Sequence, residues 1–124
     1  MNREIKFRGY SEELKYFVYG FLQEVDVEGV GYSYIFWQGN TTPVRADSVS
    51  QFTGMYDKNG KEIYEGDILE LNNCGLLIVC FYKGEFKLQK LAEYHKKRNL
   101  YASISYLEFS VLRGNIYENP NLLQ

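Results

Sequence analysis

The sequence predicts a mainly β protein, a small barrel or roll of short antiparallel strands with one or two short helical segments. Runs rich in β-branched and aromatic residues recur along the 124 residues, and glycine and asparagine turns separate them. About seven or eight such strands fit the spacing of a small all-β fold. Aromatic residues make up 17% of the chain. This large apolar surface supplies a core and argues against disorder.

The first predicted strands depend on local alternation. Residues 5–8 alternate apolar and charged side chains, and Gly9 ends that run. The segment from Lys15 to Leu22 is ambiguous. Its apolar spacing, with Ser11 as an N-cap, fits a helix, whereas its tyrosines, glycine and valine favour a strand. We favour the strand.

Two further strands follow before the middle of the chain. Residues 32–37 are aromatic and branched, which is typical of a strand. The chain turns at Gly39 and Asn40 and resumes an extended run over 41–44. Pro43 lies in this run and cannot donate to a ladder, so we expect an edge strand or a loop there.

The second half begins with the strongest turn signal in the chain. Asn59-Gly60 is the preferred pair for a type I′ hairpin, but polar residues flank it, and a longer solvated loop fits equally well. Residues 68–71 are a predicted strand. Residues 75–82 form a near-continuous apolar run, which is expected of a central strand covered on both faces.

The remaining segments are shorter. Residues 86–89 alternate and continue the sheet, while 92–98 fit a short helix or an exposed loop. Residues 107–112 are again predicted to be extended. Asn119-Pro120 then supplies an N-cap and a proline at the first helical position, which predicts a terminal helical turn.

Length and charge narrow the class of protein. A chain of 124 residues suits one domain over 1–124, and a formal net charge of −2 is too balanced for a general polyanion binder. The charged N-terminus contains no secretory segment, and the apolar run over 76–82 is far shorter than the ~20 residues of a membrane span. We therefore expect a cytoplasmic protein with no membrane partner.

Cys74 and Cys80, on one extended segment, lie too far apart for a disulfide.

Candidate sites are few, and no catalytic residue, metal site or cofactor is predicted. Glu62, Glu65 and Asp67 form the densest carboxylate group and could hold a cation or serve as an acid and base, but turn chemistry explains them as well. A basic stretch follows later and offers a small phosphate footprint: His95, Lys96, Lys97 and Arg98. No nucleophile or phosphate-loop motif accompanies either group.

The tyrosines need a separate explanation. The chain has 12, and tyrosine is enriched at protein interfaces because it gives a large amphipathic contact area. The run at 32–37 could stack on bases, although alternating aromatics more often lie in a core or an interface: Tyr32, Tyr34, Phe36 and Trp37. Composition therefore favours a homo-oligomer that buries a tyrosine-rich face.

Three segments together resemble the YopX family, small proteins of phages and prophages in Gram-positive bacteria. They are the N-terminal REIKFR at 3–8, the long segment QFTGMYDKNGKEIYEGDIL at 51–69, and GNIYENP at 114–120. Two features depart from the family pattern. Gly9 and Tyr10 stand where the family usually carries alanine and tryptophan, and 92–102 resembles an insertion.

The resemblance implies an SH3-like barrel or roll that self-associates, and it implies no biochemical activity. Its most specific segment contains four residues that turn chemistry explains less fully, and these form the candidate binding surface: Glu62, Tyr64, Glu65 and Asp67.

The leading hypothesis is a non-enzymatic phage accessory protein that assembles with itself and binds a host or phage macromolecule in the bacterial cytoplasm. The alternative is a nucleic-acid-binding module with Lys96, Lys97 and Arg98 on phosphates. A third hypothesis is a metal-dependent hydrolase built on the carboxylates near Glu65.

Overall fold

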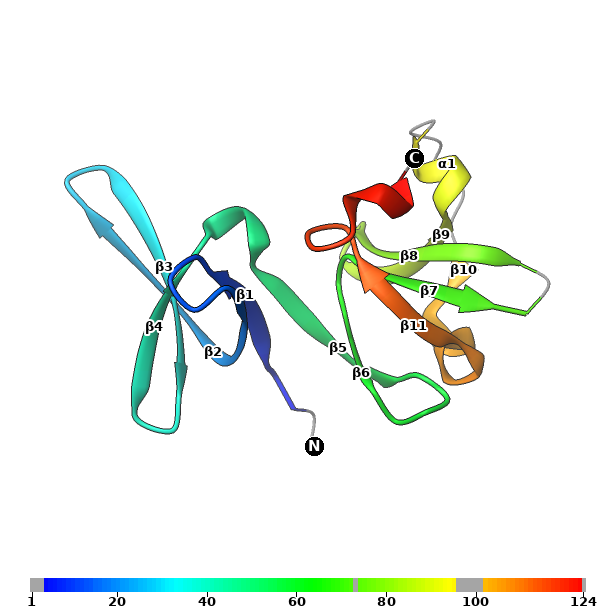
Figure 1. The fold of residues 1–124 in the computed structure, drawn as a ribbon, viewed down its shortest axis with the longest axis horizontal. Coiled ribbons are helices and arrows are strands. Elements are labelled where there is room, and N and C mark those ends of the chain that lie inside the picture. The colour runs from blue at the N-terminus through cyan, green and yellow to red at the C-terminus, as the bar shows by residue number, and fades with distance from the viewer. Residues whose placement is uncertain (1–3, 73, 96–101, 124) are drawn as a thin grey trace. The chain divides into compact units, whose positions relative to one another are not determined.

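Two antiparallel sheets contain the strands of the computed structural model, which describes residues 4–72, 74–95 and 102–123 (Figure 1). The chain divides into two compact units, Met1–Phe52 and Thr53–Gln124. The mainly β class with short helical segments is confirmed, and the strands of the described residues form no closed barrel. The expected single domain over 1–124 stays a prediction.

The six-stranded sheet has the order β4-β3-β2-β1-β5-β6. Its strands are β1 (Phe7–Ser11), β2 (Tyr16–Val27), β3 (Val30–Trp37), β4 (Asn40–Val44), β5 (Ser50–Tyr56) and β6 (Glu62–Tyr64). The boundary between the units falls inside β5, whose first residues pair with β1. A short 3₁₀ helix, η1 (Ala46–Ser48), precedes β5.

The five-stranded sheet lies in the second unit and has the order β10-β9-β8-β7-β11. Its strands are β7 (Asp67–Leu71), β8 (Gly75–Tyr82), β9 (Glu85–Lys90), β10 (Ala102–Ser103) and β11 (Val111–Asn115). The helical segments are α1 (Leu91–His95), η2 (Ile104–Phe109) and η3 (Pro120–Leu123). Of the two alternatives for 92–98, a short helix is present up to His95, and residues 96–98 lie outside the described residues. The terminal helical turn expected from the sequence is confirmed.

The ambiguous segment from Lys15 to Leu22 is a strand, as favoured. It belongs to β2, which pairs with β1 through its first half and with β3 through its second half. Gly20 lies where the partners change, with a φ of 156°, and a Cβ there would collide with the carbonyl oxygen of Phe36. Only glycine permits this close approach of two backbones, so the helical spacing of the apolar residues is incidental.

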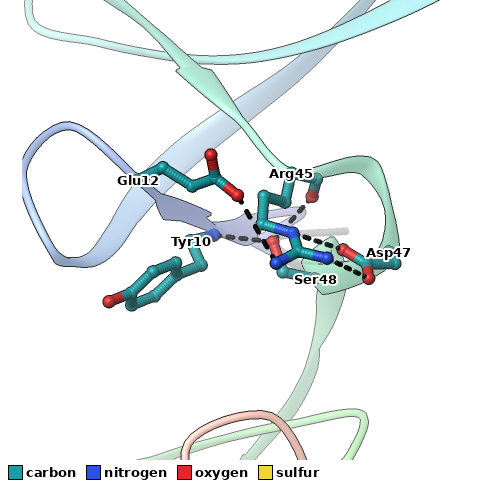
Figure 2. A network of polar contacts seen from close by, with 5 residues as sticks. All are labelled: Tyr10, Glu12, Arg45, Asp47 and Ser48. Carbon is teal, nitrogen blue, oxygen red and sulfur yellow. Dashed lines mark hydrogen bonds and ion pairs between the residues drawn. The ribbon is translucent and has the colours of Figure 1, made fainter.

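In the first unit, the chain just after the edge strand β4 lies against β1, where Tyr10, Arg45 and Ser48 form a polar network (Figure 2). The Arg45 N–H donates to the Tyr10 carbonyl oxygen at 3.0 Å. Ser48 completes the closure, because its Oγ accepts the Tyr10 N–H at 2.7 Å and donates to the Arg45 carbonyl oxygen at 2.6 Å. Around this backbone contact, the Arg45 guanidinium pairs with Asp47 at 2.9 Å and with Glu12 at 3.4 Å.

The core of the second unit lies on both faces of its sheet. One cluster contains Ile63, Leu69, Leu77, Val79, Leu88 and Leu107, and the other contains Ile68, Ile78 and Leu91. Alternate residues of β8 enter opposite clusters, which confirms the expectation that the apolar run at 75–82 is a central strand covered on both sides.

Two local expectations are corrected, and one open alternative is decided. The strand expected over 5–8 is shifted to Phe7–Ser11 and does not end at Gly9. At Asn59-Gly60 the longer loop is present and not the type I′ turn, because only Gly60 has a positive φ there. Residues 107–109 belong to η2, since the Ser103 Oγ accepts the Ser105 N–H and starts a helical turn that buries Leu107.

We predict that Ser48→Ala lowers the free energy of unfolding by about 1–3 kcal/mol. The substitution leaves the Tyr10 N–H without its acceptor beside a side chain that is only 3% exposed. Arg45→Ala is the matched control, because its ion pairs are largely exposed and such pairs contribute about 1 kcal/mol or less. Urea unfolding of both variants measures the difference, and equal losses would contradict the importance of the Ser48 contact.

Candidate functional site

The four residues expected to form a binding surface lie at the turn between β6 and β7. Tyr64 and Asp67 are each 1% exposed, while Glu62 and Glu65 are half-buried. An Asp67 carboxylate oxygen accepts the Tyr64 N–H at 2.8 Å, and the Tyr64 hydroxyl lies 3.0 Å from the Glu62 carboxylate. Tyr64 and Asp67 therefore hold the turn together, and only the two glutamates reach the surface. The binding role of this loop stays a prediction.

Glu65 is linked electrostatically to a thiol of β8. Burial raises the pKa of the Glu65 carboxyl above its ordinary value of 4.5. Burial and the nearby charge of Glu65 together raise the pKa of the Cys80 thiol to about 11. The Cys80 sulfur also lies 3.7 Å from the side-chain oxygen of Gln89. Cys80 is thus a neutral thiol at physiological pH, and it is unsuited to nucleophilic chemistry.

The described residues contain no further cluster of side chains suited to the chemistry that the sequence predicts. Among residues 4–72, 74–95 and 102–123, no group of three or more histidine, cysteine, aspartate or glutamate side chains is placed to hold a metal ion. Glu62, Glu65 and Asp67 do not supply the ligands that the hydrolase hypothesis requires. The basic residues Lys96, Lys97 and Arg98 lie outside the described residues.

Sequence reasoning missed Asp57, which organises the loop of the most specific family segment. One Asp57 oxygen accepts the N–H groups of Asn59 and Lys61 at 2.8 and 2.9 Å, and the other accepts the Leu112 N–H of β11 at 3.0 Å. Burial raises the pKa of Asp57, but these hydrogen bonds and the charge of Lys61 outweigh it, so the pKa falls below the usual 3.8. An aspartate three residues before a glycine was the available signal.

An uncharged and mostly exposed surface lies on one side of the β2–β3–β4 sheet. Register places alternate residues of the three strands on the same side. We call this surface the outer face, and its residues are Phe21, Gln23, Val25, Val27, Val30, Tyr32, Tyr34, Phe36, Thr41 and Pro43. None is charged, and all except Tyr34 are exposed. The sequence analysis identified this strand pair only in part, through the aromatics at 32–37.

The other side of the same strands, the inner face, is built differently. Near the centre of the sheet it buries Ile35, which is 2% exposed, and packs Val44 over Gly9. Toward the hairpin tip it carries Glu24 and Asp26, and the Asp26 carboxylate accepts the Gly29 N–H of the turn at 2.9 Å. The acidic groups of this hairpin therefore lie opposite the uncharged face.

An open groove of about 660 Å³ also lies in the first unit. Its lining includes Lys6, Tyr16, Ile35 and Trp37. Ile35 and Trp37 alternate with Phe36, so by register the groove lies on the inner side of these strands. The Trp37 ring lies 6.1 Å from the ring of Phe21. The first unit therefore exposes aromatic side chains on both sides of this sheet.

Comparison with known proteins supports the family and the fold. A family model described as YopX protein matches residues 6–124. The crystal structure of protein EF1440 from Enterococcus faecalis matches with a TM-score of 0.56 and 22% identity, over 99% of this chain and 100% of that one. At this identity the likeness shows the fold alone. No curated protein matches the chain. Within the described residues, no helix is long and apolar enough to cross a membrane.

We predict that Asp57 makes stability sensitive to acid. Its folded-state pKa is lowered, so its contribution is complete above about pH 4 and disappears as the pH falls through the lower folded value. Asp57→Asn should therefore lower the free energy of unfolding at pH 7 by about 1–3 kcal/mol and flatten its decrease below pH 4. Urea unfolding across this range measures the effect, with the exposed Asp47→Asn as control. Parallel acid profiles for Asp57→Asn and the wild type would contradict it.

We also predict slow alkylation of Cys80. In a Cys74→Ser background, the rate with iodoacetamide should stay low at neutral pH and rise only as the pH nears 11. Glu65→Gln should move this rise to lower pH, because it removes a charge that opposes the thiolate. Glu108→Gln, on an exposed residue of η2, is the control, and mass spectrometry measures the rates. Identical profiles for the two glutamate variants would contradict the link.

Proposed function

Because the chain belongs to the YopX protein family, we propose that it is a non-enzymatic accessory protein of a phage or prophage. It associates with itself and binds a host or phage macromolecule in the bacterial cytoplasm. The observation that carries the proposal is the outer face, an exposed and uncharged sheet surface. An apolar surface of this extent is costly to leave in water and marks an interaction site.

The distribution of apolar residues in the first unit supports this proposal. Only Phe17, Ile35 and Phe52 are its buried large apolar residues among those described, while the rings of Phe21, Tyr32 and Phe36 remain 41–55% exposed. The unit therefore exposes more of its large apolar side chains than it buries. Contact with another molecule removes this surface from water and adds to the stability of the unit.

The alternative of a nucleic-acid-binding module has less support from the described residues. Exposed tyrosine and phenylalanine rings on the outer face could stack on bases. However, the same face carries no cation, and phosphate neutralisation supplies most of the affinity of such modules. Protein–protein contact is thus the favoured role of the surface.

We predict a light-scattering mass of at least twice the 14.6 kDa of one chain. Self-association should persist in high salt, because burial of uncharged surface is not screened. A single-chain mass at every concentration would contradict self-association.

Partner binding needs a separate measurement. The immobilised protein should retain a specific component from lysate of phage-infected host cells after nuclease treatment. The Glu65→Gln variant tests the predicted binding surface against the exposed control Glu108→Gln. Fluorescence anisotropy with single- and double-stranded DNA and RNA tests the alternative. Low-salt binding that weakens steeply as salt is added would support the nucleic-acid module instead.

A further inference from the structure

We propose that the outer face is the surface on which a second copy of this chain packs, face to face. This inference rests on the self-association proposed above and assigns it to one surface of the first unit. The competing occupants are the chain's own second unit, a nucleic acid and a lipid surface. Four properties of the outer face favour a second copy.

The first property is an inverted polarity. In an antiparallel sheet with one solvated side, the solvated side is polar and the packed side apolar. Here the exposed side of the β2–β3 hairpin is aromatic and aliphatic, as in the Val25–Tyr32 pair, which is 38% and 47% exposed. The carboxylates of Glu24 and Asp26 alternate with these residues and belong to the inner face. This pattern is expected of a strand pair that is covered on its outer face.

The second property is the absence of charge. A face-to-face pair of identical chains related by a two-fold axis brings the same patch together from both sides. Any charge on that patch would lie near a like charge of the partner, which is unfavourable once water is removed. The outer face avoids this penalty, because none of its ten residues is a lysine, arginine, histidine, aspartate or glutamate. A nucleic acid would instead require lysine or arginine there.

The third property is size. Aromatic side chains can bury about 150–250 Å² each, and Phe21, Tyr32 and Phe36 are 41–55% exposed, so these three rings offer roughly 200–400 Å². A stable interface buries about 800 Å² on each partner, so the rings supply roughly a quarter to a half of that area. The exposed Gln23, valine, Thr41 and Pro43 side chains of the outer face add to it.

The fourth property is shape. Two sheets pack face to face about 10 Å apart when the side chains between them interdigitate. The tight turn at Glu28 and Gly29, both with positive φ, lets the hairpin stay regular up to Val27 and Val30. No side chain longer than phenylalanine or tyrosine projects from this face. The surface is thus regular enough for a second sheet to pack against it.

The test places one positive charge at a time on either the outer or the inner face of the β2–β3 hairpin. Val25→Lys and Tyr32→Lys add a cation to the outer face, and Glu24→Lys adds one to the neighbouring inner-face position. All three side chains are exposed, so circular dichroism should show the same fold in each variant. Light scattering should give the single-chain mass for both outer-face variants and the wild-type oligomer mass for Glu24→Lys.

A second measurement uses the unmodified protein, so that the test does not depend on whether the variants fold. Amide hydrogen exchange of the peptides covering 21–36 should slow by at least tenfold between dilute and concentrated protein, while peptides covering β8 should not change.

The outcomes separate the two claims. A wild-type oligomer whose mass is unchanged by folded Val25→Lys, or whose exchange over 21–36 does not depend on concentration, would overturn this assignment and leave self-association intact. A monomeric wild type would overturn both. A monomer that sediments with neutral phosphatidylcholine vesicles would assign the face to lipid instead.

Discussion

The hydrogen bonds of Ser48 are the constraint on which the shape of the first unit depends. They join Tyr10 of β1 to the chain just after β4, and so they close the sheet at one end. Ile35 and Val44 lie on the inner face of this sheet, and Gly9 is needed because a Cβ there would lie 2.6 Å from a Val44 methyl group. The neighbouring ion pairs of Arg45 are exposed and add little to this closure.

The exposed aromatic surface lies on the other side of the same strands. Phe21, Tyr32 and Phe36 belong to the outer face, where they remain 41–55% exposed. The second unit differs, since both faces of its central strand β8 are covered by apolar clusters. The two units therefore differ: one buries its apolar residues within the chain on both faces of a sheet, and the other leaves many of them exposed.

Much of the fold was predictable because it depends on local chemistry. The apolar run at 75–82 predicted a buried central strand, and Asn119-Pro120 predicted a terminal helical turn. The positions of the hairpin turns were predictable from their glycines, but the backbone geometry of the turns was not. The best dipeptide, Asn59-Gly60, lies in a loop that Asp57 organises through contact with β11, far away in sequence. Three tight turns are made instead by less typical pairs, in which a residue with no turn preference takes a positive φ before a glycine: Glu28-Gly29, Gln38-Gly39 and Lys83-Gly84.

In the candidate site, too, some residues are explained by local sequence and others only by the pairing of strands. The family segment drew attention to Tyr64 and Asp67, yet their burial and mutual hydrogen bond explain them as parts of a turn. Composition indicated an interface, but it could not say which side of a strand would be exposed, because a shift of one residue in register exchanges the two faces. Only the pairing of Val25 with Tyr32 and of Phe21 with Phe36 separates an aromatic side from an acidic one. Which face is aromatic and which is acidic therefore depends on register, a property that the sequence specifies only through the complete sheet.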